Sequence, residues 1–260
     1  MRALALLALW LPLAAAADKP VDAGPYVPSP QSVVSDMLKL AGVGPHDYVI
    51  DLGSGDGRIV RTAALVFGAS GMGVEIKDDL VRQANADAQR EGIGNRVKFV
   101  TADLFKTDLS AATVVTMYLL PDTVNLLREK LLRELRPGTR VISHDYPLSG
   151  WVPEKYVQMD LEDKVKISGV TTTLIYLYVV PARVEGRWRG TAAGQPFTLD
   201  LKQDITRVSG RGSGAGRDAP LENAKLRGEQ LSFRLAGRDY RGRVQGASIA
   251  GEGWHVGRVQ

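Results

Sequence analysis

The sequence predicts an α/β fold in which a doubly wound parallel sheet with an antiparallel edge hairpin is followed by a small all-β domain. Apolar strand-like runs alternate with helix-like segments between Tyr48 and Ser143, which is typical of parallel strands joined by right-handed crossovers. Two strand-like runs then follow without a helix between them, Tyr156–Leu161 and Thr171–Val180, and these indicate an antiparallel hairpin. Beyond Pro181, short alternating runs separated by glycine replace the helical periodicity.

Length and composition favour a globular protein with one principal domain. The chain has 260 residues, of which 44% are hydrophobic, and this is enough to bury a full core. It has no cysteine, which excludes disulfides, cysteine-based zinc sites and a thiol nucleophile. Its three histidines, His46, His144 and His255, are not spaced like metal ligands, so we expect no metal. We expect an N-terminal segment (residues 1–17), the α/β domain (18–182) and the all-β domain (183–260).

The first 17 residues have the layout of a secretory signal peptide. They combine a basic start, an apolar middle and small residues at the end, with Ala15–Ala17 before Asp18 as the expected cleavage site. The apolar stretch is shorter than the ~20 residues that span a bilayer. We therefore expect export to the periplasm. The alternative is a membrane-associating anchor that leaves the body of the protein in the cytoplasm.

The parallel sheet and its helices can be assigned element by element. Ser29 is expected to cap a first helix that begins at Pro30 and ends before Gly42. The elements expected next are strand Tyr48–Leu52, helix Arg58–Phe67, strand Gly71–Ile76, helix Asp79–Arg90, strands Val97–Thr101 and Thr113–Tyr118, a helix from Pro121 that ends before Pro137, and strand Arg140–Ser143.

The C-terminal third is basic and is expected to form a small antiparallel meander. Residues 183–260 carry 14 Lys and Arg against 8 Asp and Glu, whereas the whole chain has a net charge of +4. This excess favours an anionic partner such as nucleic acid or lipid headgroups, although arginine on the solvent face of a small sheet also explains it. Gly210–Gly216 is expected to be a flexible hairpin tip. The expected strands are Glu185–Thr191, Pro196–Gln203, Ile205–Ser209, Ala224–Arg227, Gln230–Leu235, Tyr240–Val244 and Ser248–Val256.

A glycine loop follows the first strand of the sheet. Asp51 ends the apolar run, and Gly53, Gly55 and Gly57 follow at alternate positions, with Ser54 between the first two. Glycine lets the backbone turn sharply and lets a ligand approach closely, and the helix start beyond supplies free N–H groups. Asp51 would repel a pyrophosphate, but it suits a ligand that carries an ammonium or sulfonium group. The loop therefore predicts S-adenosylmethionine as the cofactor.

Acidic residues also end the next two strands. Glu75 is expected to accept hydrogen bonds from ribose hydroxyls, and Asp103 with Leu104 is expected to bind the adenine. Thr116 lies at the end of the fourth strand, beside the expected position of the reactive methyl group. Each acid taken singly can equally be a turn cap or a solvated strand end. A nicotinamide dinucleotide is the main alternative cofactor, since Glu75 lies 18 residues after Gly57, but the glycines run G-x-G-x-G and not G-x-G-x-x-G.

The ends of the fourth and fifth strands supply the expected catalytic residues. Tyr118 can face a cationic centre through its ring, and a tyrosine of the core is an equal alternative. His144 or Asp145 can accept a proton from an amine, although a residue there is more often a strand-end hydrogen bonder. Trp151 is expected either to wall the acceptor pocket or to anchor a loop on the sheet.

Several stretches of residues 25–156 carry a family resemblance. Asp51–Val60, Gly73–Glu75 and Asp103–Phe105 resemble the motifs of class I S-adenosylmethionine-dependent methyltransferases. Pro25–Pro30 and Ser143–Trp151 are similar, more narrowly, to mitochondrial lysine methyltransferases that act on the ATP synthase c-subunit and the adenine nucleotide translocase, and to their bacterial relatives. By position, the resemblance implies that the cofactor is bound by Asp51, Gly53, Gly55, Glu75 and Asp103, and that Tyr26 and Ser29 lie near its methionine end or the acceptor.

The resemblance implies an enzyme that transfers a methyl group to a protein lysine or another amine. The mechanism implied is an in-line displacement, in which positioning of the nucleophile is the main task. A DNA base is a weaker acceptor, because the fourth strand lacks the Asn/Asp-Pro-Pro-aromatic signature. The alternative is a cofactor sensor or an envelope-associated binding protein on the same core. The complete set of acids and glycines favours the enzyme, whereas export favours the binding protein because S-adenosylmethionine is a cytoplasmic metabolite.

Overall fold

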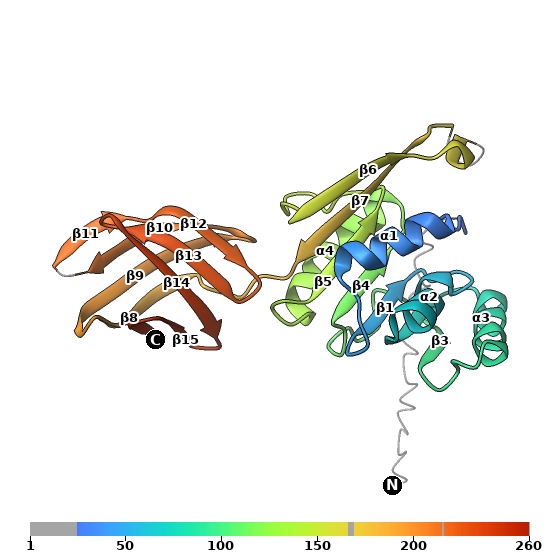
Figure 1. The fold of residues 1–260 in the computed structure, drawn as a ribbon, viewed down its shortest axis with the longest axis horizontal. Coiled ribbons are helices and arrows are strands. Elements are labelled where there is room, and N and C mark those ends of the chain that lie inside the picture. Colours follow the sequence, from blue (N-terminus) through green and yellow to red (C-terminus); the bar gives the residue numbers. More distant parts are fainter. Residues whose placement is uncertain (1–24, 166–168, 215, 260) are drawn as a thin grey trace, which may run out of the picture.

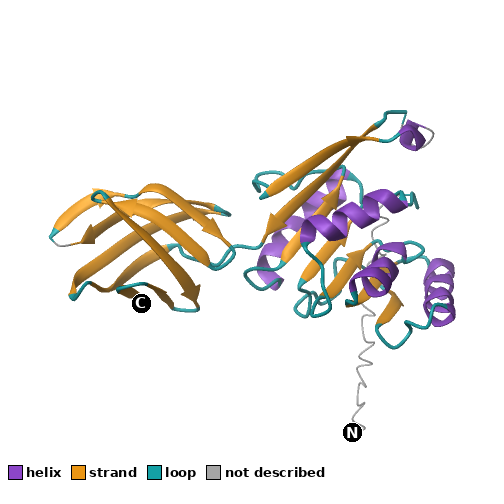
Figure 2. Ribbon diagram, in the orientation of Figure 1, coloured by secondary structure: helices purple, strands orange, loops and turns teal. Residues whose placement is uncertain are grey.

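The chain folds around two β-sheets, as a computed structural model shows for residues 25–165, 169–214 and 216–259 (Figure 1). The first is a mixed sheet of seven strands in the order β3-β2-β1-β4-β5-β7-β6, and helices cover it. The second has nine antiparallel strands in the order β11-β10-β9-β8-β16-β15-β14-β13-β12, and its part of the chain contains strands and loops (Figure 2). The predicted fold class is confirmed.

The parallel part of the first sheet follows the predicted order of elements. β1 pairs with β2 on one side and with β4 on the other, so the strand order reverses at the carboxyl end of β1, where ligands of such sheets bind. The strands are β1 (Tyr48–Leu52), β2 (Ser70–Glu75), β3 (Val97–Thr101), β4 (Val114–Met117) and β5 (Arg140–His144). The helices are α1 (Gln31–Ala41), α2 (Arg58–Phe67), α3 (Asp78–Arg90) and α4 (Pro121–Glu134).

Apolar side chains on both faces of the sheet hold the helices in place. Val49 of β1 packs with Val34 and Leu38 of α1 in one buried cluster. The next residue, Ile50, packs with Leu127 of α4 in another. Because successive strand residues point to opposite faces, a strand covered on both faces needs the continuous apolar run that β1 has.

The start of α1 differs from the prediction. Pro30 occupies the N-cap position, and no side chain caps the helix. The hydroxyl of Ser29 instead lies 2.8 Å from Nδ1 of His144, at the end of β5. A hydrogen-bond partner 115 residues away outcompetes the local cap, and the local sequence pattern does not report such a contact.

The antiparallel edge hairpin is confirmed. β7 (Thr172–Val179) pairs with β5, and β6 (Lys155–Asp160) forms the edge, with a short 3-10 helix η1 (Glu162–Lys164) in the connection. Trp151, just before β6, is buried and packs on Tyr178 of β7, with the ring centroids 5.2 Å apart. Trp151 is therefore a loop anchor on the sheet and not a pocket wall.

The second sheet rolls up so that its first strand in the chain pairs with its last, β8 with β16 (Figure 2). Large apolar side chains, including Trp188, Phe197, Phe233 and Trp254, fill the space inside it. The strands are β8 (Gly186–Ala192), β9 (Gln195–Asp204), β10 (Arg207–Gly214), β11 (Arg217–Pro220), β12 (Glu222–Arg227), β13 (Gln230–Leu235), β14 (Arg238–Gln245), β15 (Ser248–Gly251) and β16 (Trp254–Arg258).

The prediction of a hairpin tip over Gly210–Gly216 is right only at the end of this stretch, where Gly214 pairs with Arg217 across a turn, because the rest of it is a strand. β10 continues through Gly214 and pairs with both β9 and β11, a strand that the sequence pattern did not indicate. A Cβ atom on Gly210 would lie 2.1 Å from the carbonyl oxygen of Asp200, so glycine permits close backbone approach there. The run Ser248–Val256 is likewise two strands, because Gly251 and Trp254 pair across a two-residue turn.

The two sheets meet near the amino end of β5. The N–H of Ala182 donates to the carbonyl of Gly228 at 2.8 Å, and Nε of Arg227 lies 2.7 Å from Oε1 of Glu154. This junction therefore lies at the opposite end of the parallel strands from the carboxyl ends of β1, β2 and β4, where the strand order reverses. The predicted domain boundary, between residues 182 and 183, falls in the connection between β7 and β8.

Candidate active site

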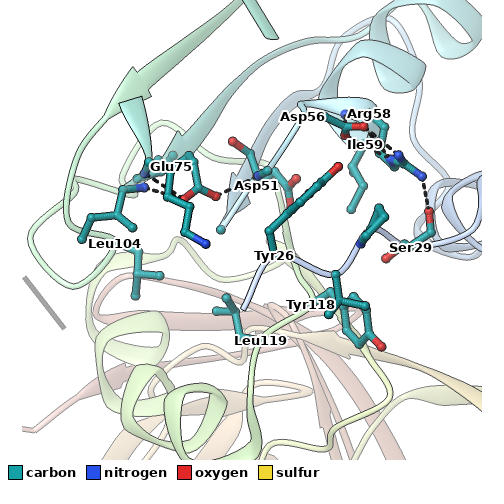
Figure 3. Close-up of a pocket in the computed structure, with 18 of the residues that line it drawn as sticks. Tyr26, Ser29, Asp51, Asp56, Arg58, Ile59, Glu75, Leu104, Tyr118 and Leu119 are labelled. Carbon is teal, nitrogen blue, oxygen red and sulfur yellow. Dashed lines mark hydrogen bonds and ion pairs between the residues drawn. The ribbon is translucent and has the colours of Figure 1, made fainter. Parts of the chain in front are cut away.

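A cavity of about 230 Å³ lies at the carboxyl ends of β1, β2 and β4. Figure 3 shows Glu75 and Leu104 at one end of it, Ser29 and Tyr118 at the other, and Tyr26 between them. Nine of the residues predicted from the sequence line it: Tyr26, Ser29, Asp51, Gly53, Ser54, Gly55, Glu75, Leu104 and Tyr118. Five predicted residues lie close by without lining it: Gly57, Asp103, Thr116, His144 and Asp145.

The glycine loop requires glycine at each of its three alternate positions. Gly53, Gly55 and Gly57 have φ angles of 76°, 52° and 79°, which other residues rarely adopt. A Cβ atom on Gly55 would lie 2.4 Å from the ring of Tyr26, so the tyrosine ring rests on the loop. A Cβ atom on Gly57 would instead meet Phe99 at 2.5 Å, which makes Gly57 a packing position behind the loop.

Backbone N–H groups hold the carboxylate of Glu75 in place. Its Oε2 accepts from Gly55 at 2.9 Å, and its Oε1 accepts from Ile76 at 2.8 Å and from Lys77 at 3.0 Å. The first of these bonds ties the end of β2 to the glycine loop. A carboxylate has about four acceptor positions, so Glu75 can still accept from a ligand hydroxyl.

Asp51 lies beneath the glycine loop, with an exposed fraction of 2%. Burial raises the pKa of its carboxyl to about 7, because the charged form loses its hydration, and the charges of Glu75 and Asp56 add to this effect. The hydroxyl of Thr116 opposes the rise by donating to Oδ1 at 2.7 Å. Thr116 thus acts on the cavity through Asp51 and does not face the ligand space itself.

The N-terminal segment Pro25–Pro30 crosses the cavity and is tied to the glycine loop by Arg58. Nη1 of Arg58 donates to the carbonyl of Ser29 at 2.9 Å, while its Nε and Nη2 donate to both carboxylate oxygens of Asp56. Burial alone would raise the pKa of Asp56, but the hydrogen bonds and charge of Arg58 lower it below its usual range. The hydroxyl of Tyr26 faces this pair, and burial followed by the charge of Asp56 raises its pKa.

Sequence reasoning missed the roles of Asp56 and Arg58, although both belong to the loop Asp51–Val60 that was singled out. The sequence did contain a signal for their ion pair. Asp56 and Arg58 lie two positions apart at the start of a helix, and this spacing allows a bidentate hydrogen-bonded pair. The second partner of Arg58, the carbonyl of Ser29, gives no signal in the sequence because any residue carries one.

The carboxylate of Asp103 is engaged in a turn. Its Oδ1 accepts from the N–H of Phe105 at 2.8 Å, and Lys106 lies 3.9 Å from its Oδ2. The cavity wall at the end of β3 consists of Ala102 and Leu104 instead. At the end of β3, a ligand in the cavity would therefore meet apolar side chains.

Tyr118 is the one predicted catalytic residue that lines the cavity. Its ring lies against the imidazole of His144, with centroids 3.9 Å apart and an interplanar angle of 30°. Burial, followed by the charge of Asp145 and a hydrogen bond to it, raises the pKa of the Tyr118 hydroxyl. His144 is fully buried behind the ring, and burial lowers its pKa to about 4, so the imidazole is neutral near pH 7.

The cavity suits S-adenosylmethionine in shape and in chemistry. Gly53 and Gly55 line it without a side chain, and a buried carboxylate, Asp51, offers a partner for a cationic ligand. The hydroxyl of Ser54 is buried without a hydrogen-bond partner in the described structure. Val74, Ile76 and Leu104 add apolar wall at the Glu75 end. Among the described residues, no group of acids and histidines is arranged to hold a metal ion.

Comparison with known proteins agrees with this interpretation of the site. The ANTKMT methyltransferase domain matches residues 51–155. A protein-lysine N-methyltransferase of Saccharolobus islandicus is 43% identical over 157 residues, which are 60% of this chain and 93% of that protein. The lysine N-methyltransferase of the ATP synthase c-subunit from Xenopus laevis is 36% identical, and the adenine nucleotide translocase lysine N-methyltransferase of Mus musculus is 38% identical. The chain covers 57% and 56% of these two, and each alignment spans 50% of this chain.

A solved structure shares the same core. The crystal structure of an RNA methyltransferase from Salinibacter ruber in complex with S-adenosyl-L-homocysteine is 44% identical, with a TM-score of 0.55. The match covers 61% of this chain and 96% of that chain.

Fold, cavity and relatives together define an S-adenosylmethionine-dependent methyltransferase, and the predicted enzyme class and cofactor are confirmed. More narrowly, the chain belongs to the family of the protein-lysine N-methyltransferase of Saccharolobus islandicus, and its residues 51–155 match the ANTKMT methyltransferase domain.

Proposed function

We propose that this enzyme methylates the ε-amino group of lysine in a protein. The observation that carries the proposal is its similarity to the protein-lysine N-methyltransferase of Saccharolobus islandicus, 93% of whose length it covers at 43% identity. The geometry supports it, because Tyr118 presents an aromatic ring at one end of the cavity. Such a ring, with a neutral imidazole stacked on it, gives favourable contact to an amine or ammonium group.

The proposed roles of the residues follow their positions along the cavity. Glu75 would accept from the ribose hydroxyls, and Leu104 would contact the adenine. Gly53, Ser54 and Gly55 would bring the backbone close to the ligand, while Asp51 would attract its positive charge. Thr116, Gly57 and Asp103 would act indirectly, by orienting Asp51, packing the loop and shaping the turn after β3. Tyr26 and Ser29 would close the cavity from the N-terminal segment.

When bound, S-adenosylmethionine supplies a methyl group on a sulfonium, which is electrophilic. The work left to the chain is to bring an unprotonated amine to the methyl in line with the leaving sulfur. A lysine amine has an ordinary pKa near 10.4, so the site must favour its neutral form. Tyr118 would contribute a ring face that holds the nitrogen in position both before and after it loses its proton.

RNA is the second candidate acceptor. The observation that favours it is the 44% identity to the RNA methyltransferase of Salinibacter ruber, at 96% coverage of that chain. The basic C-terminal region adds to this case, because exposed arginines attract phosphate. A cofactor sensor without transferase activity is the third possibility, and it shares the same cavity.

Incubation with methyl-labelled S-adenosylmethionine separates these functions. We would add a cell extract divided into protein and RNA fractions, and hydrolyse the labelled protein to its amino acids. Label recovered as methylated lysine supports the proposal, and label confined to RNA overturns it. Gly55→Arg, which places a bulky side chain in the cavity, serves as the inactive control. Absence of label in both fractions, with calorimetric binding of the cofactor intact, would favour the sensor.

For the N-terminus, we propose that residues 1–17 direct export or, alternatively, anchor the protein to a membrane with its body in the cytoplasm. These residues lie outside the described structure, and no described helix is both long and apolar enough to cross a membrane. The basic start and apolar middle of the sequence support the proposal. Reporter fusions after residue 17 and after the C-terminus would give the side of the membrane on which each lies. A cytoplasmic C-terminal reporter would exclude export.

For the second sheet, we propose contact with an anionic partner. Lys225 and Arg241 flank Ser232 across β12, β13 and β14, and neither forms an ion pair among the described residues. Arg243, on the same face, is paired with Glu229. We would measure binding to heparin. Binding that weakens as salt rises, and that is reduced in the double variant Lys225→Gln/Arg241→Gln, would support the contact. Binding unchanged in this double variant would exclude this face.

A further inference from the structure

Behind the Tyr118 end of the cavity, three side chains stand in a row. Ser29 lines the cavity, and its Oγ lies 2.8 Å from Nδ1 of the buried His144. On the far side of the imidazole, Nε2 lies 3.7 Å from Oδ2 of Asp145. The row therefore runs from an acid, through an imidazole, to a hydroxyl at the ligand space.

The surroundings of the imidazole select one of its two neutral forms. Nε2 is buried and has no hydrogen-bond partner among the described residues. Two charges act on the imidazole: the carboxylate of Asp145, with Oδ2 3.7 Å from Nε2, has the larger effect, and the ammonium of Lys164, bonded to Oδ1 of Asp145, opposes it. That carboxylate is fixed by Nζ of Lys164 at 2.7 Å and by the N–H of Leu174 at 3.1 Å. An N–H directed toward a carboxylate is attractive, whereas a lone pair directed toward it is repulsive. Nε2 therefore carries the hydrogen, and Nδ1 carries the lone pair.

The form of the imidazole decides what Ser29 offers to a ligand. With a lone pair on Nδ1, the Ser29 hydroxyl must donate its single hydrogen to His144. A hydroxyl has one hydrogen and two lone pairs, so the pairs are left to face the cavity. The low pKa of His144, about 4, keeps this arrangement in place at neutral pH. Ser29 is thus an acceptor toward the cavity and not a donor.

We propose that His144 and Asp145 are positioning residues that hold Ser29 as a hydrogen-bond acceptor for an N–H group of the methyl-accepting amine. This inference rests on the proposed function. A neutral lysine amine has two N–H groups and one lone pair. If Ser29 accepts one N–H, the rotation of the amine is restricted and its lone pair can be aimed at the methyl. The nitrogen pair then forms the N–C bond, the C–S pair returns to sulfur, and the surplus proton leaves the product ammonium for water. No proton passes through His144.

The tautomer can be measured without changing the chain. We would record the imidazole nitrogen shifts of the ¹⁵N-labelled protein, in which only three histidines contribute, and assign His144 by its loss in His144→Gln. We expect a protonated Nε2 and an unprotonated Nδ1. In Asp145→Asn, which keeps a residue tolerant of the φ of 63° at this position, we expect this preference to weaken. A protonated Nδ1 in the wild type would overturn the proposal, whatever the enzyme methylates.

Kinetics then test the role of the hydroxyl. Ser29→Ala should lower kcat with a lysine peptide about tenfold, as expected for one lost hydrogen bond, with the Kd for S-adenosylmethionine unchanged within twofold. Ser29→Thr, which keeps a hydroxyl, should retain most of the rate. Ser35→Ala is the matched control, because that hydroxyl on α1 contacts only the backbone of Gln31.

The N–H donor has a second possible source, the amino group of the cofactor's methionine. A parallel loss of cofactor affinity and of rate in Ser29→Ala would assign the contact to that group and overturn the proposal. An unchanged kcat would do the same. If the wild type transfers no methyl group to lysine, the proposed function is wrong. The imidazole nitrogen shifts would still show whether Asp145, His144 and Ser29 are arranged as proposed.

Discussion

At the scale of single residues, Asp51 is a carboxylate kept where water cannot reach it. Its burial raises its pKa to about 7, well above the 3.8 of an exposed aspartate. Burying a carboxylate costs free energy, and a cationic ligand bound beside Asp51 would offset that cost. The position therefore suits a binding role for Asp51. Binding of such a ligand would restore the charged form and release a proton near neutral pH.

The first prediction concerns the pH dependence of stability in the absence of cofactor. Between about pH 4 and pH 7 the folded protein holds a proton on Asp51 that the unfolded chain has lost, so the free energy of unfolding falls as pH rises. The fall is at most roughly 1.4 kcal/mol for each pH unit. In chemical denaturation, Asp51→Asn should lose this component of the pH dependence. Identical slopes for wild type and variant would show that Asp51 is not perturbed.

The second prediction separates steric fit in the glycine loop from backbone strain. Gly55 and Gly42 both have positive φ, 52° and 62°, but only a Cβ on Gly55 would meet the ring of Tyr26. Gly55→Ala and Gly42→Ala should each cost about 1 kcal/mol of stability. Only Gly55→Ala should weaken S-adenosylmethionine binding in calorimetry, by about tenfold or more. Equal cofactor affinity in the two variants would contradict the contact between Tyr26 and the loop.

At the scale of elements, the N-terminal segment Pro25–Pro30 is a cover whose position depends on α2. Arg58, at the first residue of α2, donates to the carbonyl of Ser29 while Asp56 holds its guanidinium from the other side. The planar fork of arginine makes both contacts at once, which lysine cannot do. The cover and the glycine loop are therefore joined by one side chain.

The third prediction follows from this joint. Arg58→Lys should release the segment and speed the dissociation of S-adenosylmethionine about tenfold or more, which corresponds to one charge-assisted hydrogen bond. Arg82→Lys, on α3, is the control, because Arg82 pairs with Asp78 of its own helix and neither residue lines the cavity. Stopped-flow measurement of cofactor release compares the two. Equal release rates would mean that the segment is held by other contacts.

At the scale of the whole molecule, the two sheets have distinct cores and meet away from the cavity, with Ile205, between β9 and β10, packed against the core of the first sheet. Trp188 and Trp254 belong to the core of the second sheet, and none of the residues of the first sheet joins that cluster in the described structure. The junction near Gly228 lies by the amino end of β5, whereas the cavity lies beyond the carboxyl ends of β1 and β2. The second sheet therefore adds a surface to the enzyme without shaping the cofactor site.

The fourth prediction tests this separation. A Cβ atom on Gly190 would lie 2.0 Å from the carbonyl oxygen of His255, between β8 and β16, so Gly190→Ala should destabilise the second sheet by more than about 2 kcal/mol. Calorimetric melting should show this loss, and the affinity for S-adenosylmethionine should stay within twofold of wild type. Gly257→Ala, in β16, is the control, because its φ is not positive and a Cβ there would meet no atom closer than 4.0 Å. A large loss of affinity in Gly190→Ala would contradict the separation of the two sheets.

The elements that were predicted well are those whose signal is local. β1 and α2 begin and end at the predicted residues, because a buried strand needs a continuous apolar run and a helix needs its own periodicity and a terminal glycine. The glycine loop was also predicted correctly, because its residues are consecutive in the sequence. Most of the stretch Gly210–Gly216 was misread, since glycine marks both a turn and a strand where another backbone comes close.

By itself, the sequence determined the order of the elements, the cofactor class and most of the residues around the cavity. These follow from patterns within a few residues of one another, from Asp51 to Gly57 above all. Tertiary structure alone decided which side chains share a hydrogen bond: Thr116 with Asp51, Ser29 with His144, Arg58 with the carbonyl of Ser29. Contacts of this kind join residues far apart in the chain, and they form only when the sheet brings the strand ends together.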